Sequence, residues 1–397
     1  MTDVFEKMLY LAGAGARGIS AEVEVDDCIE KLRELSLRYS IWPIVYLGLP
    51  ERYQFLYQTE VLSIVSGNIK RNIFAIKVIN EIKHNGIDVL VLKGTSVASL
   101  YNNPEFRVSG DVDLLIPIRH EKKVMNLLKK MGFTVYNREH NSQHFLATHP
   151  RAGLIEVHIS LHDGSAREFL YEDRPVDFSS SKDFQYLEYK LQTLDIDTGL
   201  QHLWIHYIRH FVSEGVGIRQ VLDFLIYLER YYNQIDLNKF MQLLDAYNYK
   251  ELFLTLTAVG NKYFGFKFPV CSSEKMIELL DDIECGGTFG DKLNAQVYRI
   301  YQERKCESSG DAHKRYLVFK KIRHIRNEIF PPSVVMRTYG YQYAKNMPLL
   351  WISYVHRFMN ILVRVLRGKS LTNINDTENN DNIDRRIKLM QDLGMIE

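Results

Sequence analysis

Residues 87–116, IDVLVLKGTSVASLYNNPEFRVSGDVDLLI, combine two apolar runs with charged residues, and the rest of the chain is organised around them. The first apolar run, 89–92, is typical of a buried strand. It stops at a cationic, hydroxyl-bearing turn, KGTS, at 93–96. The second run follows Asp111 and Asp113. Because side chains alternate between the two faces of a strand, both acids project from one face and the valine between them from the other.

Two neighbouring carboxylates repel each other unless water solvates them or a cation is shared between them. A third acid, Glu156, occurs in the alternating segment 153–161, which predicts a strand with its apolar residues on one face. Glu156, His158 and Ser160 occupy the other face. If this strand lies beside that of Asp111 and Asp113, the three acids converge on one edge of a sheet. Mg²⁺ prefers such oxygen ligands, and two ions about 3.5–4 Å apart can clamp the oxygens of a nucleotidyl transfer.

The turn at 93–96 supplies groups that could hold a phosphate. Gly94 lets the backbone approach a ligand closely, and a helix that starts there offers free amide donors. Thr95 or Ser96 can donate a hydrogen bond to a phosphate oxygen. Lys93 and, from the following loop, Arg107 can offset the phosphate charge.

Composition excludes several classes of protein. The chain has 397 residues, 46% of them hydrophobic and 25% charged, as expected for a globular protein with two or three domains. A formal net charge of +1 gives no general attraction for nucleic acid, so we expect no nucleic-acid partner. The four cysteines form no C-x-x-C pair, which fits a reducing compartment, and no segment is typical of a signal peptide or a transmembrane helix. We therefore expect a cytoplasmic protein.

The pattern of apolar residues divides the chain into four parts. Residues 1–85 read as a helical region, and 86–185 as an α/β domain with the element order β-α-β-α-β-β-β and helices on one side of its sheet. Residues 186–367 read as a C-terminal helical domain and 368–397 as a polar tail. The expected fold class is α+β: a mixed sheet with helices, flanked by helical regions from both ends of the chain.

The predicted helix 198–211 carries three histidines at four-residue spacing. His202, His206 and His210 share one helical face, but the helix lacks the glutamate of a zinc-protease motif, so we interpret them as packing histidines facing the cleft opposite the sheet. Arg219 and Asp223 lie one turn apart and are expected to form an internal helix pair. The sequence alone does not decide whether these five residues line the cleft.

Three motifs together resemble a known family. They are Leu92-Lys93-Gly94, the segment from Arg107 to Asp111-Val112-Asp113-Leu114-Leu115-Ile116, and Ile155-Glu156-Val157-His158. They are similar to the bacterial uncharacterised nucleotidyltransferase family, within the polymerase β-like nucleotidyltransferase superfamily, and the resemblance covers roughly residues 40–360. Many superfamily members carry Gly-Ser at the turn, where this chain has Gly94-Thr95.

The resemblance implies a nucleotidyltransferase-type sheet and a Mg²⁺- or Mn²⁺-dependent enzyme. It would move a nucleoside monophosphate from an NTP to a small-molecule, sugar or peptide acceptor. Asp111, Asp113 and Glu156 would hold the metal, with Glu156 also deprotonating the acceptor. Substrate contacts would come from Lys93, Gly94, Thr95, Ser96, Arg107 and His158. Two alternatives remain open: a catalytically silent nucleotide-binding or toxin–antitoxin module, and an RNA-modifying nucleotidyltransferase. The acceptor, the preferred base and the oligomeric state are not encoded in any pattern that we recognise.

Overall fold

The computed structural model describes residues 2–138, 143–161, 176–213, 215–269, 273–286, 352, 354–356 and 376–396. The chain forms two compact units, one of residues 1–294 with 389–397 and one of residues 295–388. The first unit holds the sheet and all the helices from α1 to α11, and its architecture follows. Of the helical domain expected at 186–367, the described residues are 186–213, 215–269, 273–286, 352 and 354–356.

Four helices precede the sheet, as expected for residues 1–85: α1 (Asp3–Ala16), α2 (Ile29–Arg38), α3 (Trp42–Gly48) and α4 (Glu51–His84). The longest is α4, which begins after Pro50. It buries residues at alternating intervals of three and four, including Val61, Val65 and Ile79, and this spacing places them on one face. The helix ends at His84 with Asn85 as its C-cap, and Gly86 follows with a φ of 72°.

The central sheet has five strands in the order β1-β2-β5-β4-β3. Their bounds are β1 Leu90–Val91, β2 Asp111–Leu115, β3 Thr134–Val135, β4 His144–His149 and β5 Gly153–His158. β2 and β5 run parallel and every other pair runs antiparallel, so the sheet is mixed. Short helices α5 (Thr95–Ala98) and α6 (Glu121–Lys130) connect the strands, with 3-10 turns at Pro104–Phe106, Ile118–His120 and Phe178–Ser180.

A hairpin was not expected from the sequence. β6 (Lys182–Tyr186) and β7 (Tyr189–Thr193) form a separate two-stranded sheet across the boundary expected at residues 185 and 186, after which only helices had been expected. The side chain of Thr193 donates a hydrogen bond of 2.6 Å to the backbone oxygen of Val91, which joins β7 to β1. Most residues of the hairpin are polar and partly exposed, so their hydrophobic pattern is weak.

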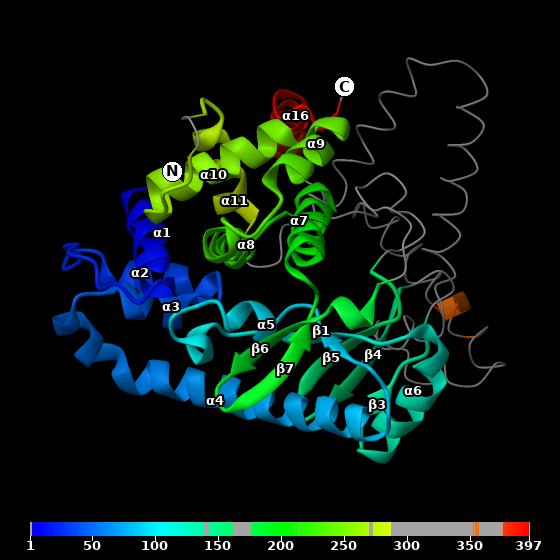
Figure 1. Ribbon diagram of the computed structural model, residues 1–397. Helices are drawn as coiled ribbons and strands as arrows, with labels where there is room; N and C mark the ends of the chain where they lie inside the picture. Colours follow the sequence, from blue (N-terminus) through cyan, green and yellow to red (C-terminus); the bar gives the residue numbers. More distant parts are fainter. Residues whose placement is uncertain are drawn as a thin grey trace, which may run out of the picture. The chain divides into compact units, whose positions relative to one another are not determined.

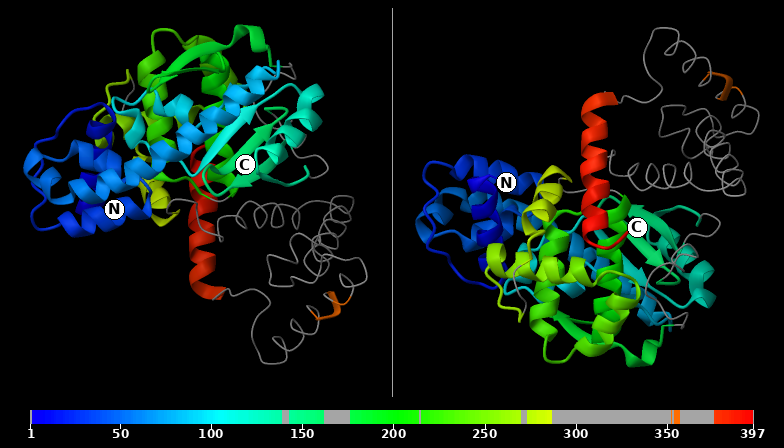
Figure 2. Two further views of the ribbon diagram at one scale, coloured as in Figure 1. Left: turned by 90° about the horizontal axis from the view of Figure 1, so that it is seen from below. Right: turned by 90° about the horizontal axis from the view of Figure 1, so that it is seen from above.

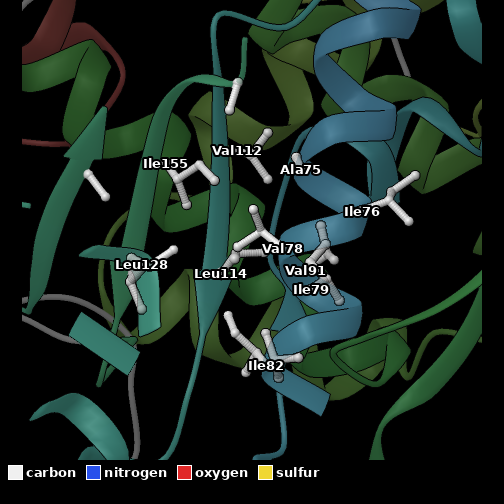
Figure 3. Close-up of a cluster of buried hydrophobic side chains, with 14 of the residues drawn as sticks. Ala75, Ile76, Val78, Ile79, Ile82, Val91, Val112, Leu114, Leu128 and Ile155 are labelled. Carbon is white, nitrogen blue, oxygen red and sulfur yellow. The ribbon is translucent and has the colours of Figure 1, made fainter. Parts of the chain in front are cut away.

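One face of the sheet packs on α4. Val78, Ile79 and Ile82 of the helix form a cluster with Val112 and Leu114 of β2, and Ile155, Val157 and Leu128 extend it, as Figure 3 shows for most of these residues. The view from below in Figure 2 shows the blue helix α4 crossing the sheet. Alternation along β2 and β5 therefore sends Asp111, Asp113 and Glu156 to the opposite face.

Two helices of the C-terminal half, α7 (Ile196–Ser213) and α8 (Ile218–Tyr231), lie on that opposite face. The chain continues with α9 (Leu237–Ala246), α10 (Lys250–Phe264) and α11 (Met276–Gly286). Figure 1 shows α7 and α8 on one side of the sheet and α4 on the other. Helices of the two flanking regions thus lie on opposite sides of the sheet, while α5 and α6 of the sheet domain contribute Ala98, Val124 and Leu128 to the cluster on the α4 side. The mixed architecture confirms the expected α+β class.

The last described segment differs from the expected polar tail. Within residues 368–397 the structure has α16 (Asp376–Asp392), in which Ile383, Ile387 and Met390 are buried. Their spacing of four and three residues is helical, and the polar composition of the surrounding sequence concealed it. Among the described helices, none combines the length and the apolar character that crossing a bilayer requires.

Candidate active site

The three acids of the sequence motifs meet in one cavity. β2 and β5 are parallel neighbours, and their register places Asp113 opposite Glu156 and Asp111 opposite Leu154. All three acids line a cavity of about 220 Å³ on the sheet face away from α4. The sequence predicted that the three acids would converge if their two strands were neighbours. The strands are neighbours, and the acids do converge.

Asp113 is the most deeply buried of the acids, at 1% exposure. Its Oδ1 atom lies 3.2 Å from the Nζ atom of Lys93 and 3.2 Å from the Nε2 atom of His158. Burial opposes ionisation, but the charge of Lys93 and the hydrogen bond from His158 outweigh it and hold the pKa of Asp113 well below its ordinary value. Asp113 is therefore a carboxylate at neutral pH. Its Oδ2 atom is buried and has no hydrogen-bond partner among the described residues.

Glu156 has different surroundings. Its Oε2 atom lies 3.7 Å from Nε2 of His158 and 4.0 Å from Nε2 of His144. Burial, followed by the negative charge of Asp113, raises the pKa of Glu156. Two acids on neighbouring strands are thus shifted in opposite directions, and Glu156 is the more basic of the two.

The turn after β1 has the backbone shape that its glycine predicts. Gly94 has a φ of 73° and a ψ of −111°, a region that residues with a Cβ rarely enter. The helix that follows, α5, has only four residues. Thr95 and Ser96 are buried. Neither lines the cavity of the three acids or a second, adjoining cavity that is described below. Lys93 lines both of these cavities, so it is the side chain of the turn that faces them.

Arg107 is held in a buried ion pair. Its Nε and Nη2 atoms donate to the two carboxylate oxygens of Asp223 at 3.0 and 2.5 Å, and Nη1 donates to Ser109. Tyr101 donates a further hydrogen bond of 2.7 Å to Asp223. Asp223 had been expected to pair with Arg219, which instead donates to the backbone oxygen of Val108 at 3.0 Å. That expectation was wrong, because a partner 116 residues away in sequence occupies the carboxylate.

The Arg107–Asp223 pair and Arg219 line a second cavity of about 140 Å³. Gly94, Asp111 and aromatic residues of α7 and α8, Tyr207 and Phe224, complete part of its wall. Lys93, Asp111, His206 and His210 belong to both cavities, so the two spaces adjoin.

The three histidines of α7 face the sheet across the larger cavity. Nε2 of His206 lies 3.3 Å from Nζ of Lys93, and the rings of His206 and His210 are 4.4 Å apart. Burial lowers the pKa of His202 to about 3 and that of His210 to about 4, and it also lowers that of His206. All three are therefore neutral at neutral pH. The open question of the sequence is resolved: these histidines line the cleft.

Sequence reasoning missed several residues of the site. His144 lines the cavity beside Glu156, and burial followed by the charge of His158 lowers its pKa to about 4. Asn68 of α4 is fully buried. It donates to the backbone oxygens of Glu105 and Arg107 and accepts from the backbone N–H of Ser109, so it fixes the loop that leads into β2. The sequence did contain a sign of this role, because Asn68 is a polar residue on the otherwise apolar face of α4.

The part of the chain that carries the sheet and the acid-lined cavity matches a known family. A family model described as "Uncharacterised nucleotidyltransferase" matches residues 45–265, more than half of the chain. The protein belongs to this family and is a transferase of the nucleotidyltransferase class.

Comparison with solved structures gives two distant neighbours. A lincosamide antibiotic adenylyltransferase, LnuA, bound to lincomycin, is 12% identical with a TM-score of 0.30, and the match covers 38% of this chain and 93% of that one. The antibiotic-resistance factor ANT(2'')-Ia is 11% identical with a TM-score of 0.35, covering 47% and 96%. No curated protein sequence matches.

Proposed function

We propose that this enzyme transfers a nucleoside monophosphate from an NTP to a hydroxyl group of a small acceptor in a Mg²⁺-dependent reaction. The observation that carries the proposal is the placement of Asp113 opposite Glu156, with Asp111 two residues away, in one cavity that Lys93 also lines. Family membership supports the class of reaction.

The donor set of the cavity fits a divalent metal ion. Three carboxylates offer oxygen ligands, which Mg²⁺ and Mn²⁺ prefer, and Oδ2 of buried Asp113 has no partner within the described chain. When bound, such an ion would neutralise phosphate charge and polarise the reacting oxygens. Asp111, Asp113 and Glu156 would hold it.

The remaining steps belong to the protein's own side chains. Glu156 is suited to take the proton of the acceptor hydroxyl, because its raised pKa makes it a better base than Asp113. The acceptor oxygen forms a bond to the α-phosphorus while the bond to pyrophosphate breaks. The ammonium of Lys93 neutralises Asp113 in the free protein, and within the same cavity it can rotate to the triphosphate.

The other candidate residues take different parts in this proposal. His158 orients Asp113 through its hydrogen bond and lies within reach of Glu156. Arg107 positions the loop before β2, because its guanidinium is already bound by Asp223 and Ser109. Gly94 shapes the turn that presents Lys93, and buried Thr95 and Ser96 support that turn.

The place of action and the acceptor are part of the proposal. Cys28 forms no disulfide with any residue that the structure describes, which supports a reducing compartment such as the cytoplasm. Sugars and peptides are the acceptor classes that we would test first, because each offers hydroxyl groups.

The test is pyrophosphate release from a mixed NTP pool with Mg²⁺ and pools of sugar and peptide acceptors. We expect release that chelation stops and that Asp111→Asn and Asp113→Asn each reduce at least about a hundredfold, the scale on which losing a catalytic electrostatic group acts. Asp183→Asn, at an exposed hairpin position, is the control. Wild-type release in both site variants would overturn the site assignment. NTP binding without release under any condition would favour the silent module, and release only with tRNA would favour the RNA-modifying alternative.

A further inference from the structure

Beside the three acids, the cavity contains a group of nitrogen ligands that the sequence did not connect. His144, Glu156 and His158 each place one ligand atom within 4.8 Å of the others. We propose that these three residues form a second metal position, which selects a divalent first-row transition-metal ion such as Zn²⁺ over Mg²⁺.

The backbone fixes the geometry of this cluster. β4 and β5 are antiparallel neighbours, and their register pairs His144 directly with His158. Directly opposed residues point to the same face of a sheet, and the two imidazole rings are 5.0 Å apart. Glu156 lies two residues before His158 on the same strand and therefore on the same face. All three ligands thus belong to strands of the central sheet, and this makes the site preformed.

The distances are close to those of ligands around one ion. Tetrahedral bonds of about 2.0–2.2 Å place two ligand atoms about 3.3–3.6 Å apart. The Oε2 atom of Glu156 is 3.7 Å from Nε2 of His158 and 4.0 Å from Nε2 of His144, and all three ligand atoms lie within 4.8 Å of one another. Side-chain rotations that move these atoms by about 1 Å would close the set around an ion.

Two buried atoms in the same place lack partners. One is the Oε1 atom of Gln143, in the wall of the cavity, and the other is the Oδ2 atom of Asp113; neither has a hydrogen-bond partner among the described residues. Metal binding at Nε2 of His158 requires the tautomer with its proton on Nδ1. Asp113, whose Oδ1 atom is 3.2 Å from Nε2 of His158, would then lie beside the ion instead of accepting a hydrogen bond from the ring.

The ligand set determines which ions fit. Two imidazoles and one carboxylate suit Zn²⁺ and its neighbours, whereas Mg²⁺ requires oxygen ligands and retains its water. Three protein ligands also leave a coordination position open. Glu156 is shared with the carboxylate site, so the two positions are adjacent, but ion binding at this second position does not depend on turnover.

The test is an optical titration of the tag-free, full-length chain with Co²⁺, whose d–d bands report nitrogen ligation, repeated in excess Mg²⁺. We expect one bound Co²⁺ that Zn²⁺ displaces and excess Mg²⁺ does not. Even loss of an outer-shell partner weakens metal binding about 10–100-fold, so His144→Ala and His158→Ala should each weaken it at least about tenfold. His84→Ala, at an exposed histidine on α4, is the matched control.

Three results would overturn the proposal: Co²⁺ affinity unchanged in both site variants, equal loss in His84→Ala, or displacement of Co²⁺ by the excess of Mg²⁺. Circular dichroism and the unfolding midpoint establish that each variant is folded. Because the readout is binding, it is independent of pyrophosphate release. Co²⁺ binding in a protein without turnover would support this metal position and contradict the proposed function. Turnover without Co²⁺ binding would support the proposed function and contradict this metal position.

Discussion

At the scale of single residues, burial decides the charge of the histidines around the cavity. The pKa of His202 is about 3 and that of His210 about 4, while an unfolded chain titrates near about 6.5. As the pH falls below about 6.5, the unfolded state binds protons that the folded state does not, so stability is lost towards acid. Between about pH 7 and pH 5, we expect a loss on the order of 1–2 kcal/mol per buried histidine.

Urea denaturation at a series of pH values measures this loss. His210→Asn should flatten the dependence of the unfolding free energy on pH, and His84→Asn, at an exposed position, should leave it unchanged. Identical pH profiles for wild type and His210→Asn would show that His210 is not held neutral by the fold.

The buried pair of Arg107 and Asp223 leads to a second prediction at this scale. Removing one partner leaves an uncompensated charge in the interior, which costs about 3–5 kcal/mol. We therefore expect Asp223→Asn to lower the free energy of unfolding by about that amount, measured by chemical denaturation. Glu24→Gln removes the partner of exposed Arg52 and should change little. Equal effects of the two substitutions would contradict the structural role of the buried pair.

At the scale of elements, the turn after β1 depends on a single glycine. A Cβ at Gly94 would find ordinary space, 3.5 Å from the backbone oxygen of Asp111, but the φ of 73° would be strained. Such strain costs on the order of 1–3 kcal/mol. We expect Gly94→Ala to destabilise the protein by that amount and also to weaken NTP binding, because the turn presents Lys93.

Gly86→Ala provides the matched control. Its φ is 72°, and a Cβ there meets nothing within 4 Å. The substitution should destabilise the protein in the same way and leave NTP affinity unchanged, as measured by calorimetry. If both variants bind NTP normally, the turn does not position Lys93 for the substrate.

Helix α4 carries two buried asparagines with different tasks. Asn68 bonds the backbone of the loop before β2, whereas Asn72 donates to the hydroxyl of Tyr186 at 2.8 Å. Leaving buried polar groups unpaired costs about 1–3 kcal/mol, so Asn68→Ala and Asn72→Ala should both destabilise. Only Asn68→Ala should reduce Mg²⁺-dependent turnover, because only that loop leads to Asp111. Equal turnover losses would assign both residues a general stabilising role.

The sequence could predict local features and not remote pairing. Alternation at 153–161 placed Glu156 and His158 correctly on one face, because period two is a property of a single strand. The register that brings Glu156 beside Asp113 pairs residues 43 positions apart in the sequence. No pattern within either strand reveals such a pairing. The same reason hid the Arg107–Asp223 pair and the approach of His144 to His158 across two strands.

At the scale of the whole molecule, the N-terminal helices are bonded to the C-terminal helices within one compact unit. Arg17, after α1, donates to the backbone oxygens of Phe264 and Gly265 at 2.8 and 2.5 Å, at the end of α10. A cation at a helix C-terminus satisfies free carbonyls and the helix dipole. Arg17 lies outside the residues that match the family, 45–265.

We expect Arg17→Met to lower the free energy of unfolding by about 1–3 kcal/mol, because it leaves two carbonyls without a charged donor. Chemical denaturation measures the change, and Arg119→Met, at an exposed position, is the control. An unaltered denaturation curve for Arg17→Met would mean that α1 is held by apolar packing alone.

Helix α4 has a mechanical consequence. Its 34 residues span about 50 Å. In its first half, Glu60 accepts hydrogen bonds from Arg33 and Trp42. Its last turns pack against the sheet. One uninterrupted helix therefore acts as a rigid rod to which the N-terminal helices and the sheet are both fastened. Neither can swing without the other, so we expect the carboxylates of β2 and β5 to keep their position relative to the N-terminal helices when substrate enters.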